Sequence, residues 1–86
     1  MPTVAFVAGM VILFYYDDHD PPQFHVRGAD FLARVLISDG SILNISGRMT
    51  SRESRILRQW AARHRKALTE NWALARRDKP LLKIES

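Results

Sequence analysis

Hydrophobic and polar positions at the start of the chain follow the pattern of paired strands. Val, Ile, Phe and Tyr dominate residues 3–16, and Gly9 interrupts this run where a tight turn or a bulge would let the chain reverse. We therefore predict two short strands, at about residues 3–8 and 10–16. The segment 17–22 then ends the sheet, because its paired prolines cannot donate hydrogen bonds to a neighbouring strand and its aspartates favour turns.

Three further strands are predicted after this loop. They correspond to the apolar runs at residues 24–27, 31–38 and 42–46. The dipeptide Asp39-Gly40 falls between the last two runs, and it is typical of a two-residue type I′ hairpin turn, in which both central residues have positive φ. The pattern therefore predicts an antiparallel meander of about five strands.

One amphipathic helix is predicted over about residues 51–77. Thr50 and Glu53 have the spacing of a capping box, which marks a helix start. At 100° per residue most arginines lie opposite an apolar arc, whose members are Ile56, Leu57, Trp60, Ala61, His64, Ala67, Leu68, Trp72, Leu74 and Ala75. Because this phase continues to Arg77, we prefer one long helix, straight or kinked, to two helices with a break near residue 68. Its length of about 40 Å would make its end overhang, bend or meet a second subunit in a homodimer.

The composition fits a single α+β domain that covers residues 1–86, with the sheet over about 3–46 and the helix after it. A chain of 86 residues, 47% of them hydrophobic, can bury one core but not two. It has no cysteine, which excludes disulfides, zinc-thiolate sites and thiol nucleophiles. The apolar N-terminal stretch has no preceding Lys or Arg and is too short to span a bilayer, so we expect a cytoplasmic protein without a membrane anchor.

The net charge of +4 conceals a strong asymmetry between the two halves of the chain. Residues 1–47 are acidic overall, whereas residues 48–77 hold eight arginines and one lysine against two glutamates. Such segregation favours RNA, DNA or an acidic protein as a partner, and the alternative is a helix face that is merely solvated. The candidate binding residues are Arg52, Arg55, Arg58, Arg63, Arg65, Lys66, Arg76 and Arg77.

The segment YYDDHDPPQFHV at residues 15–26 is distinctive. Together with the opening Met-Pro-Thr, the segment NWALA at 71–75 and Lys-Pro at 79–80, it resembles the bacterial domain of unknown function numbered 4160. The resemblance implies a small bacterial protein, often encoded beside a second small protein of the domain of unknown function numbered 2442. It therefore implies a cognate protein partner of that type and a role in a toxin-antitoxin pair. The family pattern usually reads Pro-Pro-His-Phe-His, and Gln23 stands where the first histidine would be.

The same segment contains residue types that can bind a metal ion. Asp18, His19 and His25 would be the ligands, since imidazole and carboxylate suit zinc or manganese. Strand alternation, however, places His25 on one face with Gln23 and Arg27. Glutamine is a poor ligand and arginine repels a cation, so we predict neither a metal nor a cofactor.

A catalytic interpretation draws on His19, His25 and Arg27. A metal-independent ribonuclease needs a general base, a general acid and a cation beside the phosphorane. These three residues have the side chains required for the three roles, and Tyr16 is a further candidate. The alternative is structural: the aspartates form turns, the prolines stiffen the loop, and His25 makes a hydrogen bond across the sheet.

The leading functional hypothesis is a component of a two-gene bacterial module, non-enzymatic or weakly enzymatic, that acts through a protein partner and, by its basic helix, through nucleic acid. The second is a metal-independent endoribonuclease toxin with its site in the 17–27 loop. The third is a binding domain that holds a small ligand under this loop. These hypotheses include both an enzyme and non-enzymatic proteins.

Overall fold

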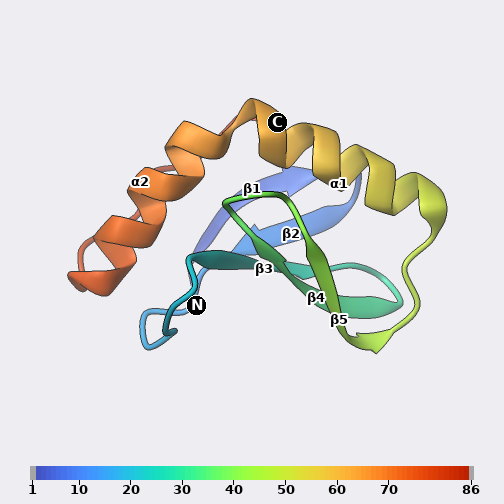
Figure 1. Cartoon of the computed structure of the whole chain (residues 1–86), viewed down its shortest axis with the longest axis horizontal. Helices are drawn as coiled ribbons and strands as arrows, with labels where there is room; N and C mark the ends of the chain where they lie inside the picture. Colours follow the sequence, from blue (N-terminus) through green and yellow to red (C-terminus); the bar gives the residue numbers. More distant parts are fainter. Residues whose placement is uncertain (1, 86) are drawn as a thin grey trace.

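The computed structural model of the chain describes residues 2–85, except for the side chain of Asn44. It is an α+β fold with five strands and two helices (Figure 1). The elements are β1 (Thr3–Val7), β2 (Met10–Leu13), β3 (Gln23–Arg27), β4 (Phe31–Leu36), β5 (Ile42–Gly47), α1 (Ser51–Arg63) and α2 (Arg65–Arg76). The strands form one antiparallel sheet in the order β1-β2-β3-β4-β5, so the predicted meander is confirmed.

The β1–β2 and β4–β5 hairpins, which contain Gly9 and Gly40, turn in different ways. Between β1 and β2, Ala8 and Gly9 have φ of 48° and 81°, and Val7 pairs with Met10. This is the two-residue geometry with two positive φ values that a type I′ turn requires, and it confirms the tight turn predicted at Gly9.

The turn after β4 is longer than predicted. The type I′ turn expected at Asp39-Gly40 is wrong, because Gly40 (φ 75°) is the only residue of this turn with positive φ. β4 ends at Leu36, whose carbonyl accepts from the amide of Gly40 and whose amide donates to the carbonyl of Ser41, at 2.9 Å each. Asp39 instead accepts a hydrogen bond on its carboxylate from the amide of Ser41, so the hairpin itself is confirmed but its turn type is not.

The prediction of one long helix is also wrong, because the chain breaks into α1 and α2 at His64 (φ −114°, ψ 23°). A straight helix from Ser51 to Arg76 would be about 39 Å long, whereas the longest dimension of the molecule is 34 Å. At this break the chain bends, and α2 slopes down from the line of α1 (Figure 1). Trp60 of α1 and Leu68 of α2 are consequently both buried in the core.

The core lies between the helices and one face of the sheet. Phe24 of β3 packs at 6.0 Å between ring centroids against Trp60, and at 6.4 Å against Phe14. Val26 and Val35 lie on the same sheet face and are almost fully buried. These contacts hold β3, and with it the preceding loop, in a fixed position under the helices.

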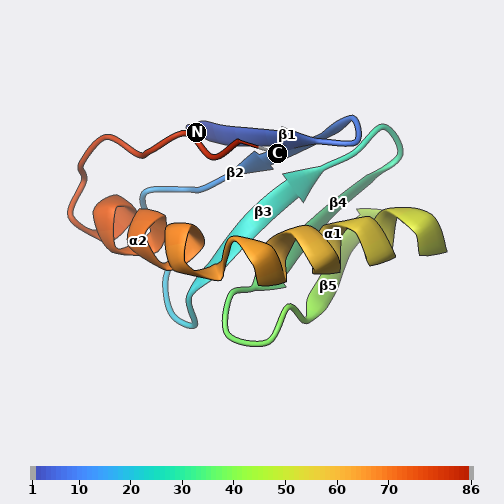
Figure 2. The ribbon, with the colours of Figure 1, turned by 90° about the horizontal axis from the view of Figure 1, so that it is seen from above.

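The C-terminal segment is fastened to both α2 and β1 (Figure 2). The buried Asn71 side chain donates to the carbonyl of Leu82 at 2.9 Å and accepts from its amide at 2.8 Å. The amide of Ile84 donates to the carbonyl of Val4. Residues 81–84 do not form a further strand beside β1. Within residues 2–85, neither helix is long and apolar enough to cross a membrane.

Candidate functional site

The loop before β3 brings one histidine and one aspartate together. His25 Nε2 lies 3.0 Å from Asp18 Oδ2, and the two side chains are 18% and 16% exposed. The ring of Tyr15 approaches His25 edge-on, with centroids 4.4 Å apart. The pair joins the loop to the strand, because Asp18 precedes the prolines and His25 is in the middle of β3.

The other two predicted catalytic residues lie apart from this pair. His19 is exposed, and its backbone amide donates to Asp18 Oδ1 at 3.1 Å. In the described part of the chain, no contact joins the His19 ring to His25. Arg27 is exposed at the far end of β3, two residues beyond His25 and on the same sheet face. The structure therefore pairs His25 with Asp18, which the sequence identified only as a metal ligand.

Gln23 shapes the loop from inside, a role that its sequence context did not indicate. It is 1% exposed, and its Nε2 donates to the carbonyls of His19 and Pro21 at 3.1 Å each. Its Oε1 accepts from Arg34 Nη1 at 3.3 Å. Both polar atoms of the amide are thus used to hold the chain reversal, which includes a cis Asp20-Pro21 peptide bond.

The three possible metal ligands do not form a cluster. Among residues 2–85, no group of three or more His, Cys, Asp or Glu side chains is arranged to hold an ion. Asp18 and His25 contact each other directly.

Contacts with the end of α2 hold the loop from the other side. The Tyr16 hydroxyl donates to the carbonyl of Lys79 at 3.1 Å. Arg76 Nη1 lies 3.5 Å from Asp20 Oδ1, and both side chains are well exposed, so this ion pair contributes little stability. The guanidinium of Arg76 also lies 5.6 Å from the ring centroid of Trp72.

Eight cationic side chains cover the solvent side of the two helices, and we call this surface the basic face. Its members are all exposed: Arg52, Arg55, Arg58, Arg63, Arg65, Lys66, Arg76 and Arg77. Within residues 2–85, only Arg76 among them forms an ion pair. The Glu53 carboxylate accepts from the amide of Thr50 in the capping box, and among residues 2–85 it forms no ion pair with these cations. The basic face therefore presents mostly uncompensated charge.

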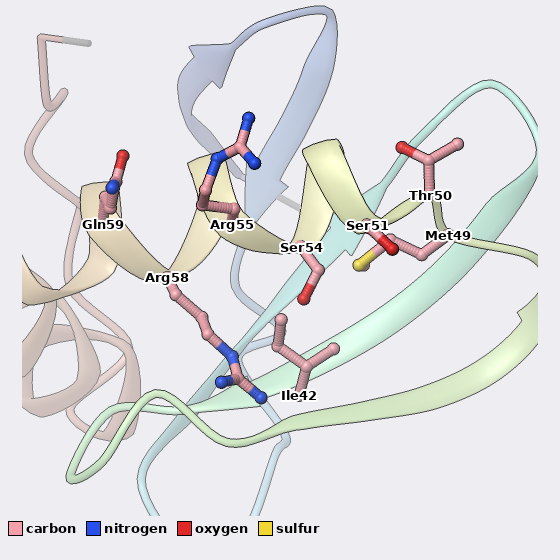
Figure 3. A pocket seen from close by; sticks show the side chains of 8 residues that line it. All are labelled: Ile42, Met49, Thr50, Ser51, Ser54, Arg55, Arg58 and Gln59. Atoms are coloured by element: carbon pink, nitrogen blue, oxygen red, sulfur yellow. The ribbon is translucent and has the colours of Figure 1, made fainter.

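A groove lies beside the first turns of α1, between this helix and the start of β5 (Figure 3). It has a volume of about 610 Å³ and is open to solvent. Ser54 and Arg58 extend from α1 toward Ile42, whereas Arg55 points to the other side of the helix. The remaining lining residues are Met49, Thr50, Ser51 and Gln59.

The groove combines the guanidinium group of Arg58 with hydroxyl groups, and both kinds of donor bind phosphate oxygens in proteins. Arg55 and Arg58 were identified from the charge pattern. Ser54 and Gln59 were not, because no local signal shows that β5 passes beside them.

Comparison with known proteins gives one result. The family model described as a domain of unknown function (DUF4160) matches residues 9–73. No curated protein and no solved structure matches the chain significantly.

Proposed function

The chain belongs to the DUF4160 family, and from this premise we propose that it is a non-enzymatic binding component of a two-gene bacterial module, which binds nucleic acid and a partner protein. The family description names no activity, so the proposal depends on the surface of the molecule. The partner half is supported by the resemblance to proteins that are encoded in pairs. The nucleic-acid half is supported by the basic face.

The observation that carries the nucleic-acid half is the exposure of eight cations with a single weak ion pair among the described residues. Positive charges that lie close together on adjacent turns repel each other unless an anion lies over them. On a face that is merely solvated, interspersed acidic residues would reduce the repulsion between the cations. Here only Glu53 and Glu70 accompany these cations on α1 and α2. A bound polyanion would neutralise this repulsion.

The chemistry of the basic face indicates binding to the phosphate backbone. Arginine pairs with phosphate oxygens through two parallel N–H groups, and seven of the eight cations are arginine. The two tryptophans cannot stack on bases, because Trp60 is 1% exposed and Trp72 is 8% exposed. We therefore expect similar affinity for different nucleotide sequences.

The test is a salt titration of binding to single-stranded RNA and to duplex DNA. Each phosphate contact releases counterions, so log K should fall with log salt by about 0.7 to 0.9 per contact. Arg55→Glu with Lys66→Glu should weaken binding to all sequences and reduce the slope by about two contacts. The matched control is Arg27→Glu with Lys83→Glu, which changes the net charge equally outside the basic face and should retain most of the affinity. Absence of binding to both nucleic acids would refute this half of the proposal.

The ribonuclease alternative is kept for one observation, the contact between Asp18 and His25. A carboxylate that holds an imidazole is a common arrangement for acid-base chemistry, and Arg27 lies about 7 Å further along the same strand face. A nuclease at this site would cleave RNA in the presence of a chelator, and His25→Asn would abolish cleavage. The non-enzymatic proposal expects the purified protein to leave RNA intact.

A further inference from the structure

We propose that the sheet face opposite the helices docks an acidic, amphipathic segment of a partner protein. This inference deepens the partner half of the proposed function and does not depend on the nucleic-acid half. We call this surface the open sheet face. From the pairing of the strands and the lining of a hollow between them, its members include the apolar Phe6, Val11, Leu13, Leu32, Leu43 and Ile45 and the polar His25, Arg27, Arg34 and Ser46.

The register of the strands determines this surface. His25 is paired with Leu13 on one side and with Arg34 on the other, and Arg34 is paired with Leu43. Directly paired residues point to the same side of a sheet. Ile45 joins them through an irregularity in the pairing of β5, because Ser46 and Asn44 are paired with consecutive residues of β4 and Ile45 has no partner in the register.

The open sheet face is apolar where a solvated face should be polar. Antiparallel sheets with one side in water normally alternate hydrophobic and polar residues. Here Phe6 is 64% exposed, Leu32 42%, Leu43 40% and Ile45 53%. In Figures 1 and 2 the helices lie on the other side of the sheet. Such a concentration of exposed apolar side chains is characteristic of a surface that another chain covers.

A small hollow lies near the centre of this surface, where an interface anchor would fit. Its walls come from four regions of the chain, and they include Leu13, Tyr15, Leu32 and Ile45. Arg27 also lines the hollow, and it is exposed. A side chain that enters from a partner would therefore meet apolar walls and a guanidinium group, as in the well-packed pockets that carry most of the energy of protein interfaces.

The charges on this surface determine the chemistry of its occupant. Arg27 has no ion pair within the described chain, and Arg34 donates only to the neutral Gln23. Among the residues that the structure describes, the only acidic side chain that forms an ion pair with a member of this face is Asp18, which contacts His25. In a dimer through this face, the arginines of one copy would meet the arginines of the other, and neither copy would offer a free carboxylate on this face to pair with them. Charge complementarity instead favours a segment that places Asp or Glu beside an apolar stripe.

The experiment uses the full chain and three synthetic peptides of about 18 residues, which is about five helical turns. The first has a leucine stripe flanked by glutamate, the second has lysine at every glutamate position, and the third is a scrambled form of the first. Titration calorimetry measures affinity, and methyl NMR locates the contact. We expect the glutamate peptide to bind with a Kd below about 100 μM, at least about tenfold tighter than the other two. Its methyl shifts should fall on Leu32, Leu43 and Ile45.

Variants separate this surface from the basic face. Leu43→Ser with Ile45→Ser should weaken peptide binding at least about tenfold and leave RNA affinity unchanged, with circular dichroism as the check of folding. Arg55→Glu with Lys66→Glu should weaken RNA binding and leave the affinity for the peptide unchanged. The inference is overturned if the peptides bind equally, if the shifts map to α1 and α2, or if no peptide binds at about 1 mM. Self-association that the serine variant abolishes would identify a second copy as the occupant and would also overturn it.

Discussion

Replacement of Gln23 by leucine should loosen the loop that holds Asp18 against His25. Leucine has a similar volume but no polar atoms. The change therefore removes three hydrogen bonds, two to loop carbonyls at 3.1 Å and one from Arg34 at 3.3 Å. Because residue 23 is 1% exposed, water cannot replace the lost amide at its own position.

The expected loss of stability follows from these contacts. Each hydrogen bond contributes about 1 kcal/mol net, so the three together contribute about 3 kcal/mol. Burial of the added apolar surface of leucine offsets about 1 kcal/mol, which leaves a net loss of about 2 kcal/mol. For a domain of this size each kcal/mol lowers Tm by about 4 to 8 °C, so we expect a decrease of about 8 to 16 °C.

Differential scanning calorimetry measures this shift, and Gln59→Leu is the matched control. Gln59 is exposed on α1, and no side-chain hydrogen bond joins it to the rest of residues 2–85, so the same substitution there should change stability by less than about 0.5 kcal/mol. In the Gln23 variant, NMR should also show that the ring of His25 loses its contact with Asp18. A decrease in Tm of less than about 2 °C, with the ring signals unchanged, would refute the reasoning.

Three further predictions concern the turns and the C-terminal tail. Gly47→Ala should destabilise the protein in urea denaturation by at least about 2 kcal/mol more than Gly40→Ala, because both positions have positive φ but only at residue 47 would a Cβ collide with neighbouring backbone. Asn71→Leu should release the tail, seen as faster amide exchange over residues 79–85, because it removes two buried hydrogen bonds. The hydrogen bond from the amide of Ser41 lowers the pKa of Asp39 below its ordinary value of 3.8. An NMR titration should therefore place its midpoint below 3.8, and the associated stabilisation should be present above that pH and be lost as the pH falls through the folded pKa.

Features that depend on neighbouring residues could be predicted from the sequence. The capping box is one case: the amide of Glu53 donates to Thr50 Oγ1 at 3.1 Å, and the amide of Thr50 donates to Glu53 Oε1 at 2.9 Å. The meander is another, because the turn residues between the short apolar runs bring consecutive strands side by side, where they pair. The exposure of the basic face also follows from helical periodicity, which holds on both sides of the break.

Features that depend on distant residues could not be predicted. The helix breaks at His64, where the sequence contains neither glycine nor proline, because both halves must pack on a sheet shorter than one straight helix. Gln23 is a poor metal ligand by its chemistry, but only the fold shows that its amide supports the loop. Likewise, Asp18 and His25 are seven residues apart, and the chain reversal between them creates their contact.

The sequence by itself therefore determined the five strands, the helical character of the segment after them, the order of these elements and the location of the positive charge, since each is set by periodicity or composition within a short window. The tertiary structure alone decided which surfaces these elements create. The groove between α1 and Ile42 requires that β5 pass beside the helix. The open sheet face requires a register that aligns Leu13, His25 and Arg34 across three strands. Strand register is fixed by packing of the opposite face against the helices, and that packing brings together residues from both ends of the chain.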